Sequence, residues 1–292
     1  MKKSTLTLVA AAALSMTTVA HAASPLKLEV FNPGEASIFP VSSALIVGEH
    51  EVALIDAQFQ RNDAQTLVGR IQATGKPLKT IYISHSDPDY YFGLDVIKAA
   101  FPDAKVIATP ATIAAIEASQ AGKVAYWGPI MKENAPQKII VPTPLKGDSF
   151  TVDGQKLEVK GLTGPTPDRT FVWIPSMSTV VGGIPVSANI HLWIADTQTP
   201  QSRADWRQTL QQIEQLKPKQ VVPGHFLPPM DYSLSSVTFS LQYLNTLEKA
   251  LATSKDSAAL IDTMKKQYPN LHEESSLELS AKVLKGEMKW PQ

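Results

Sequence analysis

The sequence contains no cysteine, and this absence removes several chemistries at once. Without cysteine there is no disulfide framework, no thiolate nucleophile and no cysteine-ligated metal. Histidine is scarce as well, with six residues among 292. Neither sign of charge dominates, because 27 basic residues balance 27 acidic ones, so the composition gives no electrostatic basis for binding nucleic acid. Any metal site must therefore use His, Asp, Glu or Tyr.

The remaining composition is that of an ordinary globular protein. Hydrophobic residues make up 43% of the chain and charged residues 18%, and the sequence contains 22 prolines. A length of 292 residues allows one large domain or two small ones, and either can bury a sizeable core. We find no internal repeat, and no low-complexity tract follows the first 22 residues.

The first residues have the pattern of a secretory signal. Lys2 and Lys3 precede an apolar stretch over residues 6–20, and the small-x-small sequence that ends at Ala22 fits a cleavage site. We therefore predict a Sec-type signal peptide over residues 1–22 and a periplasmic mature protein with no membrane segment. The alternative is an uncleaved membrane anchor.

Apolar runs and helical periodicity alternate along the rest of the chain. The prediction is of strands at 26–31, 43–47, 51–56, 80–84, 105–108, 150–152, 157–159, 170–174, 179–181 and 221–222, and of helices at 61–74, 93–100 and 112–119. Residues 121–149 are rich in Gly, Pro and Lys and predict a long surface loop. Ser202 is predicted to cap a further helix, and the last fifty-odd residues are predicted to be helical.

The most informative residues follow the apolar run at 80–84. His85, Asp87 and Asp89 come directly after it, and His225 follows a second predicted strand in the same way. Open α/β sheets place ligands at the carboxyl ends of their strands, and one His with two carboxylates within five residues suits a metal ion. The alternative is a polar loop in which Asp87 or Asp89 caps the next helix.

Several landmarks together resemble the metallo-β-lactamase superfamily. Residues 84–93, Ser-His-Ser-Asp-Pro-Asp-Tyr-Tyr-Phe-Gly, resemble its His-x-His-x-Asp-His-x-x-Gly motif. In family order, Asp56 ends an early strand, residues 163–167 resemble the Gly-His-Thr-Pro-Gly loop, residues 180–183 resemble the Gly-Asp strand, and residues 221–225 resemble the closing Val-Val-Pro-Gly-His. The resemblance implies an αββα sandwich, an α/β class with four layers.

The departures from the family pattern matter as much as the matches. The second motif His is Asp87, the third is Tyr90, the loop His is Pro165 and the bridging Asp is Gly183. A usual two-zinc site in this superfamily uses five His as ligands. The chain has five His after the signal, and two of them lie outside the motifs. We therefore exclude a usual two-zinc site. We predict a metallo-β-lactamase-like domain over residues 26–230 and a C-terminal helical extension over residues 231–292.

The residues that remain suggest a site for one divalent metal ion. The resemblance implies His85, Asp87, Asp89 and His225 as ligands, with zinc first and iron or manganese as alternatives. Asp89 would orient or deprotonate a metal-bound water. Tyr90 is a candidate for a weak ligand, an oxyanion donor or a proton donor, and the alternative is an aromatic side chain that packs under the loop.

Three more residues are candidates for contacts with a substrate. His191 and Asp196 follow the strand at 179–181 and its Gly182-Gly183, where related proteins place a loop over the metal. Trp127 lies in the Gly- and Pro-rich segment 121–149. His191 is also a candidate replacement ligand. Each of the three has a structural alternative, such as a second-layer hydrogen bond or an aromatic pin for a loop.

Three functions stay open at this point. The first is an exported hydrolase that uses one metal ion to activate water against an ester, lactone or related bond. The second is a non-catalytic protein that binds a small molecule on the same fold, and the third is an iron-dependent redox protein. All three have a small-molecule partner, and the sequence leaves the oligomeric state open.

Overall fold

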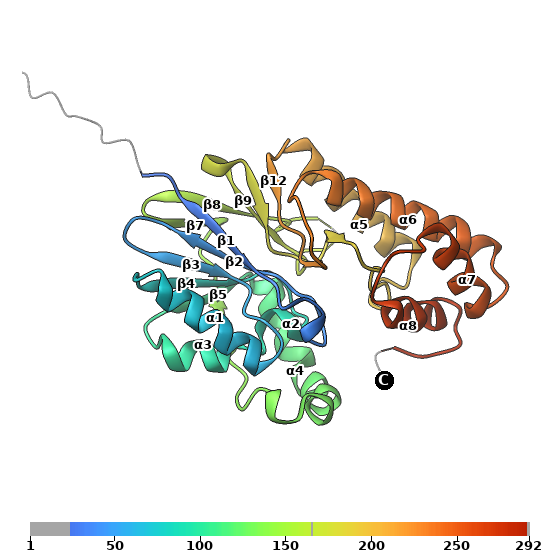
Figure 1. Cartoon of the computed structure of the whole chain (residues 1–292), viewed down its shortest axis with the longest axis horizontal. Helices are drawn as coiled ribbons and strands as arrows, with labels where there is room; N and C mark the ends of the chain where they lie inside the picture. The colour runs from blue at the N-terminus through green and yellow to red at the C-terminus, as the bar shows by residue number, and fades with distance from the viewer. Residues whose placement is uncertain (1–23, 165, 291–292) are drawn as a thin grey trace, which may run out of the picture.

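A computed structural model describes residues 24–164 and 166–290, and two stacked β-sheets form its centre (Figure 1). The signal peptide predicted over residues 1–22 therefore lies outside the described residues. The first sheet has the order β1-β2-β3-β4-β5-β6. Its strands are β1 Lys27–Phe31, β2 Ser43–Val47, β3 Val52–Ile55, β4 Leu78–Ile83, β5 Lys105–Ala108 and β6 Thr143–Pro144. The first three are antiparallel, and β3 to β6 run parallel.

The second sheet has the order β12-β10-β9-β8-β7. Its strands are β7 Ser149–Val152, β8 Gln155–Lys160, β9 Phe171–Ile174, β10 Thr179–Val181 and β12 Gln220–Val221. A separate parallel pair joins β11 (Ser187–Ala188) to β13 (His225–Phe226), and Ser187 lies opposite His225 in its register. This pairing holds His225 beside the ends of the main strands.

Helices cover the outer face of each sheet. The first group is α1 Arg61–Ala73, α2 Pro88–Tyr91, α3 Leu94–Ala100 and α4 Pro110–Met131, and the second is α5 Pro200–Gln215, α6 Ser235–Thr253, α7 Ser257–Gln267 and α8 Glu274–Leu284. Short 3-10 turns lie at Gly34–Ala36, Lys132–Asn134 and Pro175–Met177. In Figure 1 the orange and red C-terminal helices gather at the end of the molecule away from α1 and α3. None of the helices in the described part of the chain is both long and apolar enough to span a membrane.

Side-chain alternation along the strands builds the layers. Leu54 on β3 packs with the core under the first helices, whereas its neighbours Ala53 and Ile55 pack with the core between the sheets. Successive side chains of a strand point to opposite faces, so a strand that is apolar at every position must be covered on both faces. A third core joins the second sheet to α5–α8. The predicted αββα sandwich with C-terminal helices is confirmed.

Two local predictions were wrong. Residues 121–131 continue helix α4 and do not begin a loop, despite Gly122, Gly128 and Pro129. Packing outweighs the weak helix propensity of these residues, because Met131 and Trp127 contact the first core. The cap of α5 is Thr199, whose hydroxyl oxygen accepts a hydrogen bond from the backbone N–H of Ser202 at 3.0 Å.

The C-terminal helices pack as one body with the second sheet. Leu244 and Leu247 of α6, Leu260 of α7 and Leu277 of α8 share a core with Val180 of β10. Such a shared core couples the stability of the helices to that of the sheet. The predicted boundary between residues 230 and 231 precedes α6 and stays a prediction.

Candidate functional site

His85 forms the floor of the site at the end of β4. Its side chain is 2% exposed, and its Nδ1 atom accepts a hydrogen bond from the backbone N–H of Asp87 at 3.1 Å. Its Nε2 atom is buried and has no hydrogen-bond partner within residues 24–164 and 166–290. Burial lowers the pKa of His85 to about 4, because the interior disfavours the charged ring, so the ring is neutral at pH 7.

Asp89 and His225 form a closed pair beside this floor. His225 Nε2 lies 2.6 Å from Asp89 Oδ2, and His225 Nδ1 lies 3.3 Å from the Tyr90 hydroxyl. Both ring nitrogens of His225 therefore have partners in the protein. Tyr90 is completely buried, and burial raises its pKa well above the ordinary value of 10, so the hydroxyl keeps its proton.

Asp87 is paired with a cation from helix α4. The ammonium of Lys123 lies 2.9 Å from Asp87 Oδ1 and donates to the Ser86 carbonyl at 2.9 Å. Burial alone would raise the pKa of Asp87, but His85 and Lys123 together hold it well below its usual range. Asp87 is the residue before α2, as the capping alternative predicted, although its side chain makes no cap hydrogen bond.

A buried chain of hydrogen bonds supports the floor from below. Asp56 accepts from the backbone N–H of Ser84 at 2.8 Å and from its hydroxyl at 2.7 Å. The same hydroxyl oxygen accepts from the backbone N–H of Gly183 at 2.8 Å. Burial raises the pKa of Asp56 to about 7, and its hydrogen bonds from Ser84 only partly oppose this. The chain fixes the end of β4, from which His85 projects.

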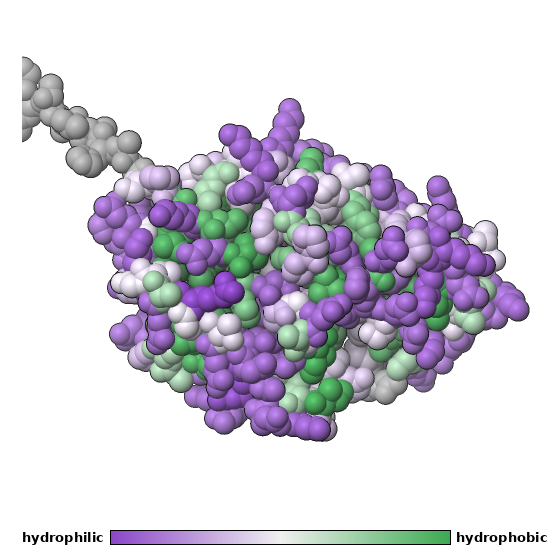
Figure 2. Space-filling view, viewed as in Figure 1, coloured by the Kyte–Doolittle hydropathy of each residue, from purple (hydrophilic) through white to green (hydrophobic). Residues whose placement is uncertain are grey.

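A cavity of about 650 Å³ lies over these residues. Its floor includes His85, Asp87, Asp89 and His225, and Lys123 and Arg169 are the two cations that line it. Tyr90 is absent from the residues that line it, so the aromatic packing alternative describes its place in the structure. The outer face in Figure 2 is mainly hydrophilic, with apolar side chains in patches, whereas much of the cavity wall is aromatic.

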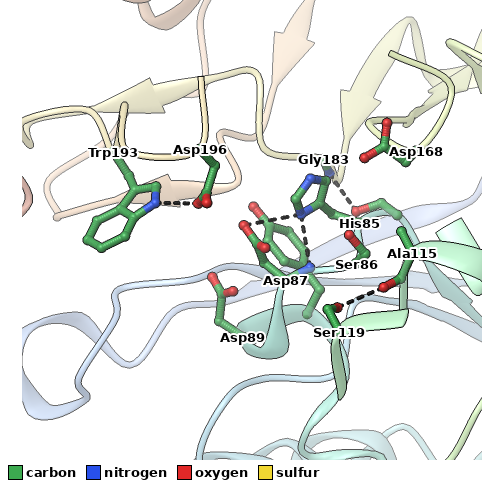
Figure 3. Close-up of polar contacts among 12 residues, drawn as sticks. His85, Ser86, Asp87, Asp89, Ala115, Ser119, Asp168, Gly183, Trp193 and Asp196 are labelled. Carbon is green, nitrogen blue, oxygen red and sulfur yellow. Dashed lines mark hydrogen bonds and ion pairs between the residues drawn. The ribbon is translucent and has the colours of Figure 1, made fainter. Parts of the chain in front are cut away.

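The three predicted substrate contacts all lie in the wall of this cavity. His191 is 1% exposed and its Nδ1 lies 3.0 Å from the Tyr243 hydroxyl, and burial lowers its pKa to about 4. Asp196 accepts from the indole N–H of Trp193 at 2.5 Å, and Figure 3 shows both residues on a loop that faces Asp87 and His85. Trp127 packs on the first core with one side. Their roles in binding stay predictions.

Comparison with known proteins places this architecture in a family. The profile of the metallo-β-lactamase superfamily matches residues 36–225, which is more than half of the chain. The chain belongs to the metallo-β-lactamase superfamily. Membership gives it the fold of metal-dependent hydrolases, and members of the superfamily typically bind divalent metal ions, commonly zinc.

Solved structures share the fold at low sequence identity. A metallo-β-lactamase family protein from Thermus thermophilus matches 88% of this chain and 92% of its own, with 17% identity and a TM-score of 0.61. A metallo-β-lactamase from Pontibacter korlensis matches 75% of this chain and 93% of its own, with 20% identity and a TM-score of 0.52. The uncharacterized protein YobT of Bacillus subtilis (strain 168) is 35% identical over 71 residues, which span 24% of this chain and 30% of YobT.

The superfamily's metal ion is a poor fit to the side chains as they stand. Within residues 24–164 and 166–290, no group of three or more His, Cys, Asp or Glu side chains could hold a metal ion. Two of the four predicted ligands, Asp89 and His225, pair with each other, whereas Asp87 pairs with Lys123 and His85 Nδ1 accepts from the Asp87 backbone. Pro165, at the position of the loop His, lies outside the described residues. The four-ligand site stays a prediction that this geometry does not favour.

Sequence reasoning missed several residues of the cavity. Lys123 and Arg169 bring positive charge to the floor, and Phe39, Tyr126 and Trp290 contribute aromatic wall. The adjacent pair Tyr126-Trp127 was a usable signal, because Tyr126 directly precedes a tryptophan that was already a candidate contact. Nothing in the sequence brings Trp290 next to residues more than 160 positions away.

Proposed function

We propose that this superfamily member binds a small molecule in the cavity and holds no resident metal ion there. The proposal rests on one observation: both carboxylates of the motif already pair with side chains of the protein. Asp87 is paired with Lys123, and Asp89 is paired with His225. These pairs leave an aromatic cavity of about 650 Å³ above two carboxylates that already have partners in the protein, and this volume is within the range of small-molecule sites.

The charge of Lys123 is the strongest argument against a metal ion at Asp87. At an effective dielectric constant of about 20, a divalent ion about 4 Å from the ammonium would be repelled by roughly 8 kcal/mol, which cancels a similar attraction to the Asp87 carboxylate. Asp87 has one carboxylate to share between the two cations, and Arg169 adds a further positive charge to the same floor. The ammonium therefore already binds Asp87 Oδ1, an atom that a metal ion would need.

The floor offers hydrogen bonds to a bound ligand. Because His85 Nδ1 accepts from the Asp87 backbone, the proton of the neutral ring lies on Nε2, the atom without a partner in the described residues. A buried donor without a partner costs about 1–3 kcal/mol, and a ligand oxygen at this atom would recover that cost. His85 thus orients a ligand, while the Asp56–Ser84 chain holds its strand in place.

A hydrolase with one metal ion is the second candidate, and the unpaired Nε2 of His85 favours it. This candidate requires the His85 proton to move to Nδ1, Asp87 to leave Lys123 and Asp89 to leave His225. As in the sequence prediction, this candidate would use zinc, iron or manganese and act on an ester or lactone. It would be exported to the periplasm. Export is equally part of the binding proposal.

Metal analysis of the mature protein separates the two candidates. Purified without chelator, the wild type should contain well under one equivalent of any transition metal, and zinc, manganese or ferrous iron should leave its melting temperature unchanged. Lys123→Met should gain metal affinity, because Asp87 is released, whereas the exposed control Lys146→Met should behave as wild type. One equivalent of metal in the wild type, lost in His85→Ala and Asp89→Ala together with esterase or lactonase activity, would overturn the proposal.

A further inference from the structure

Five aromatic side chains form a closed circuit in the wall of the cavity. The ring centroids are 5.2 Å apart for Phe39 and Trp127, 4.9 Å for Trp127 and Tyr126, and 5.6 Å for Tyr126 and Trp290. Trp290 and Trp193 are 5.4 Å apart, and Trp193 and Phe39 close the circuit at 6.4 Å. All five line the cavity. We call this set of five side chains, taken together, the aromatic ring. Its members come from four separate segments of the chain.

Asp196 holds two members of the aromatic ring in place. Its Oδ2 accepts from Trp193 Nε1 at 2.5 Å and its Oδ1 accepts from Trp290 Nε1 at 2.9 Å. The side-chain amide of Gln198 donates to the Trp290 carbonyl at 2.9 Å. Both indole N–H groups are thus used within the protein. What these two side chains offer a ligand is their π-surface, whose quadrupole attracts positive charge.

The cavity that contains the aromatic ring is negatively charged. Two cations, Lys123 and Arg169, line it together with five carboxylates, which are Asp87, Asp89, Asp168, Asp196 and Glu273. Counting these seven side chains alone, the carboxylates outnumber the cations by three. The pKa of Asp196 is raised, first by burial and then by the charge of Asp87, which shows that these carboxylates repel one another. A positive ligand would relieve that repulsion.

Aromatic walls discriminate between kinds of cation. A primary ammonium is strongly hydrated and needs hydrogen-bond acceptors in place of its water. Aromatic side chains are poor acceptors. An alkylated ammonium has few or no N–H groups and loses little when it leaves water for an aromatic enclosure. The aromatic ring together with the excess of carboxylates therefore matches a bulky, weakly hydrated cation.

We infer that the aromatic ring is the recognition site for an alkylated ammonium group on a small organic ligand. The inference rests on the proposed binding function and names the class of ligand for it. The cavity is larger than such a group alone, so the rest of the ligand extends to the floor, where His85 Nε2 and Arg169 meet its oxygen atoms. The ligand thus carries its positive charge at one end and an oxygen acceptor at the other.

Three probes that share one phenyl group test the charge preference. Benzyltrimethylammonium, benzyl alcohol and benzoate are titrated against the mature protein by isothermal calorimetry and by tryptophan fluorescence. The cation should bind at least about tenfold more tightly than the alcohol, which corresponds to ~1.4 kcal/mol, and benzoate should bind most weakly. Equal affinity for the three probes, or tighter binding of benzoate, overturns the inference and makes the ring a site for neutral or anionic aromatics.

Matched tryptophan variants locate the binding. Trp193→Leu should weaken binding of the cation about tenfold, whereas Trp193→Phe, which keeps an aromatic face, should retain most of it. Trp173→Phe is the control, because Trp173 lies on β9 outside the cavity. Circular dichroism verifies the fold of each variant. Cation binding that Trp193→Leu leaves unchanged overturns the inference. None of these readouts depends on metal content, so the proposed function fails or stands separately through the metal analysis.

Discussion

The buried carboxyl of Asp56 should make the protein less stable as the pH rises from acid to neutral. Asp56 is fully buried, and its pKa is raised to about 7 from an ordinary 3.8, chiefly because burial disfavours its charged form. Replacing it by Asn keeps its shape and an oxygen that can accept from the Ser84 N–H, but removes the titration. The variant Asp56→Asn therefore isolates the free energy linked to this proton.

The sign and size follow from proton linkage. Between pH 3.8 and about 7 the folded protein keeps the proton of Asp56 and the unfolded chain has lost it, so stability falls with rising pH and levels off above 7. Each pH unit in this window is worth about 1.4 kcal/mol. From pH 4.5 to pH 8 the wild type should thus lose about 3 kcal/mol relative to Asp56→Asn.

Urea unfolding followed by circular dichroism at pH 4.5, 5.5, 7 and 8 measures this difference. The free energy of unfolding of Asp56→Asn minus that of the wild type should rise steadily up to pH 7 and then stay constant. The exposed control Asp148→Asn should show no comparable rise. A difference for Asp56→Asn that stays flat within about 1 kcal/mol, or that falls with pH, would refute the assignment of a protonated Asp56.

Three further predictions concern packing and charge. Arg203→Met should lower the free energy of unfolding by about 3 kcal/mol in a urea titration, because the fully buried guanidinium pairs with a glutamate of α6 and bonds two carbonyls; an unchanged value would contradict this. Gly224→Ala should lower the free energy of unfolding by about 3 kcal/mol, since its Cβ would lie 2.1 Å from a carbonyl oxygen. Gly69→Ala, in open space on α1, should instead raise it by about 1 kcal/mol. Similar effects of the two variants would refute the packing argument. Lys123→Met should raise the pKa of His85 from about 4 in an NMR titration, because it removes a nearby positive charge; a fall would contradict the proposed charge pairing.

The strands and the fold could be predicted from the sequence because their signals are local. The apolar runs that form β3 and the end of β4 indicate burial residue by residue. The length of helix α4 was underestimated because Gly122 and Pro129 disfavour helix locally, whereas Trp127 and Met131 pack on a core formed by residues remote in sequence. The landmarks of the superfamily supplied the order in which these elements pack.

The chemistry of the site was less accessible, because it depends on which side chains are partners. The motif gathered His85, Asp87 and Asp89 in sequence, but the partner of Asp87 is Lys123, which comes from another helix 36 residues away. The aromatic ring was out of reach for the same reason. A motif shows which ligands a side chain such as Asp87 could bind. Its partner in the fold decides whether the side chain is already paired within the protein.

Helix α4 carries the cation that neutralises Asp87 and two members of the aromatic ring on a single turn and a half. Lys123, Tyr126 and Trp127 are three and four positions apart, so they lie on one face. A single inserted residue upstream of Lys123 would rotate that face by about 100° while the earlier part of the helix kept its packing. One such insertion would remove the cation and open the wall together. The positive charge beside Asp87 and the aromatic wall of the cavity therefore depend on the same helix face. Relatives in which this helix has a different length should differ in both.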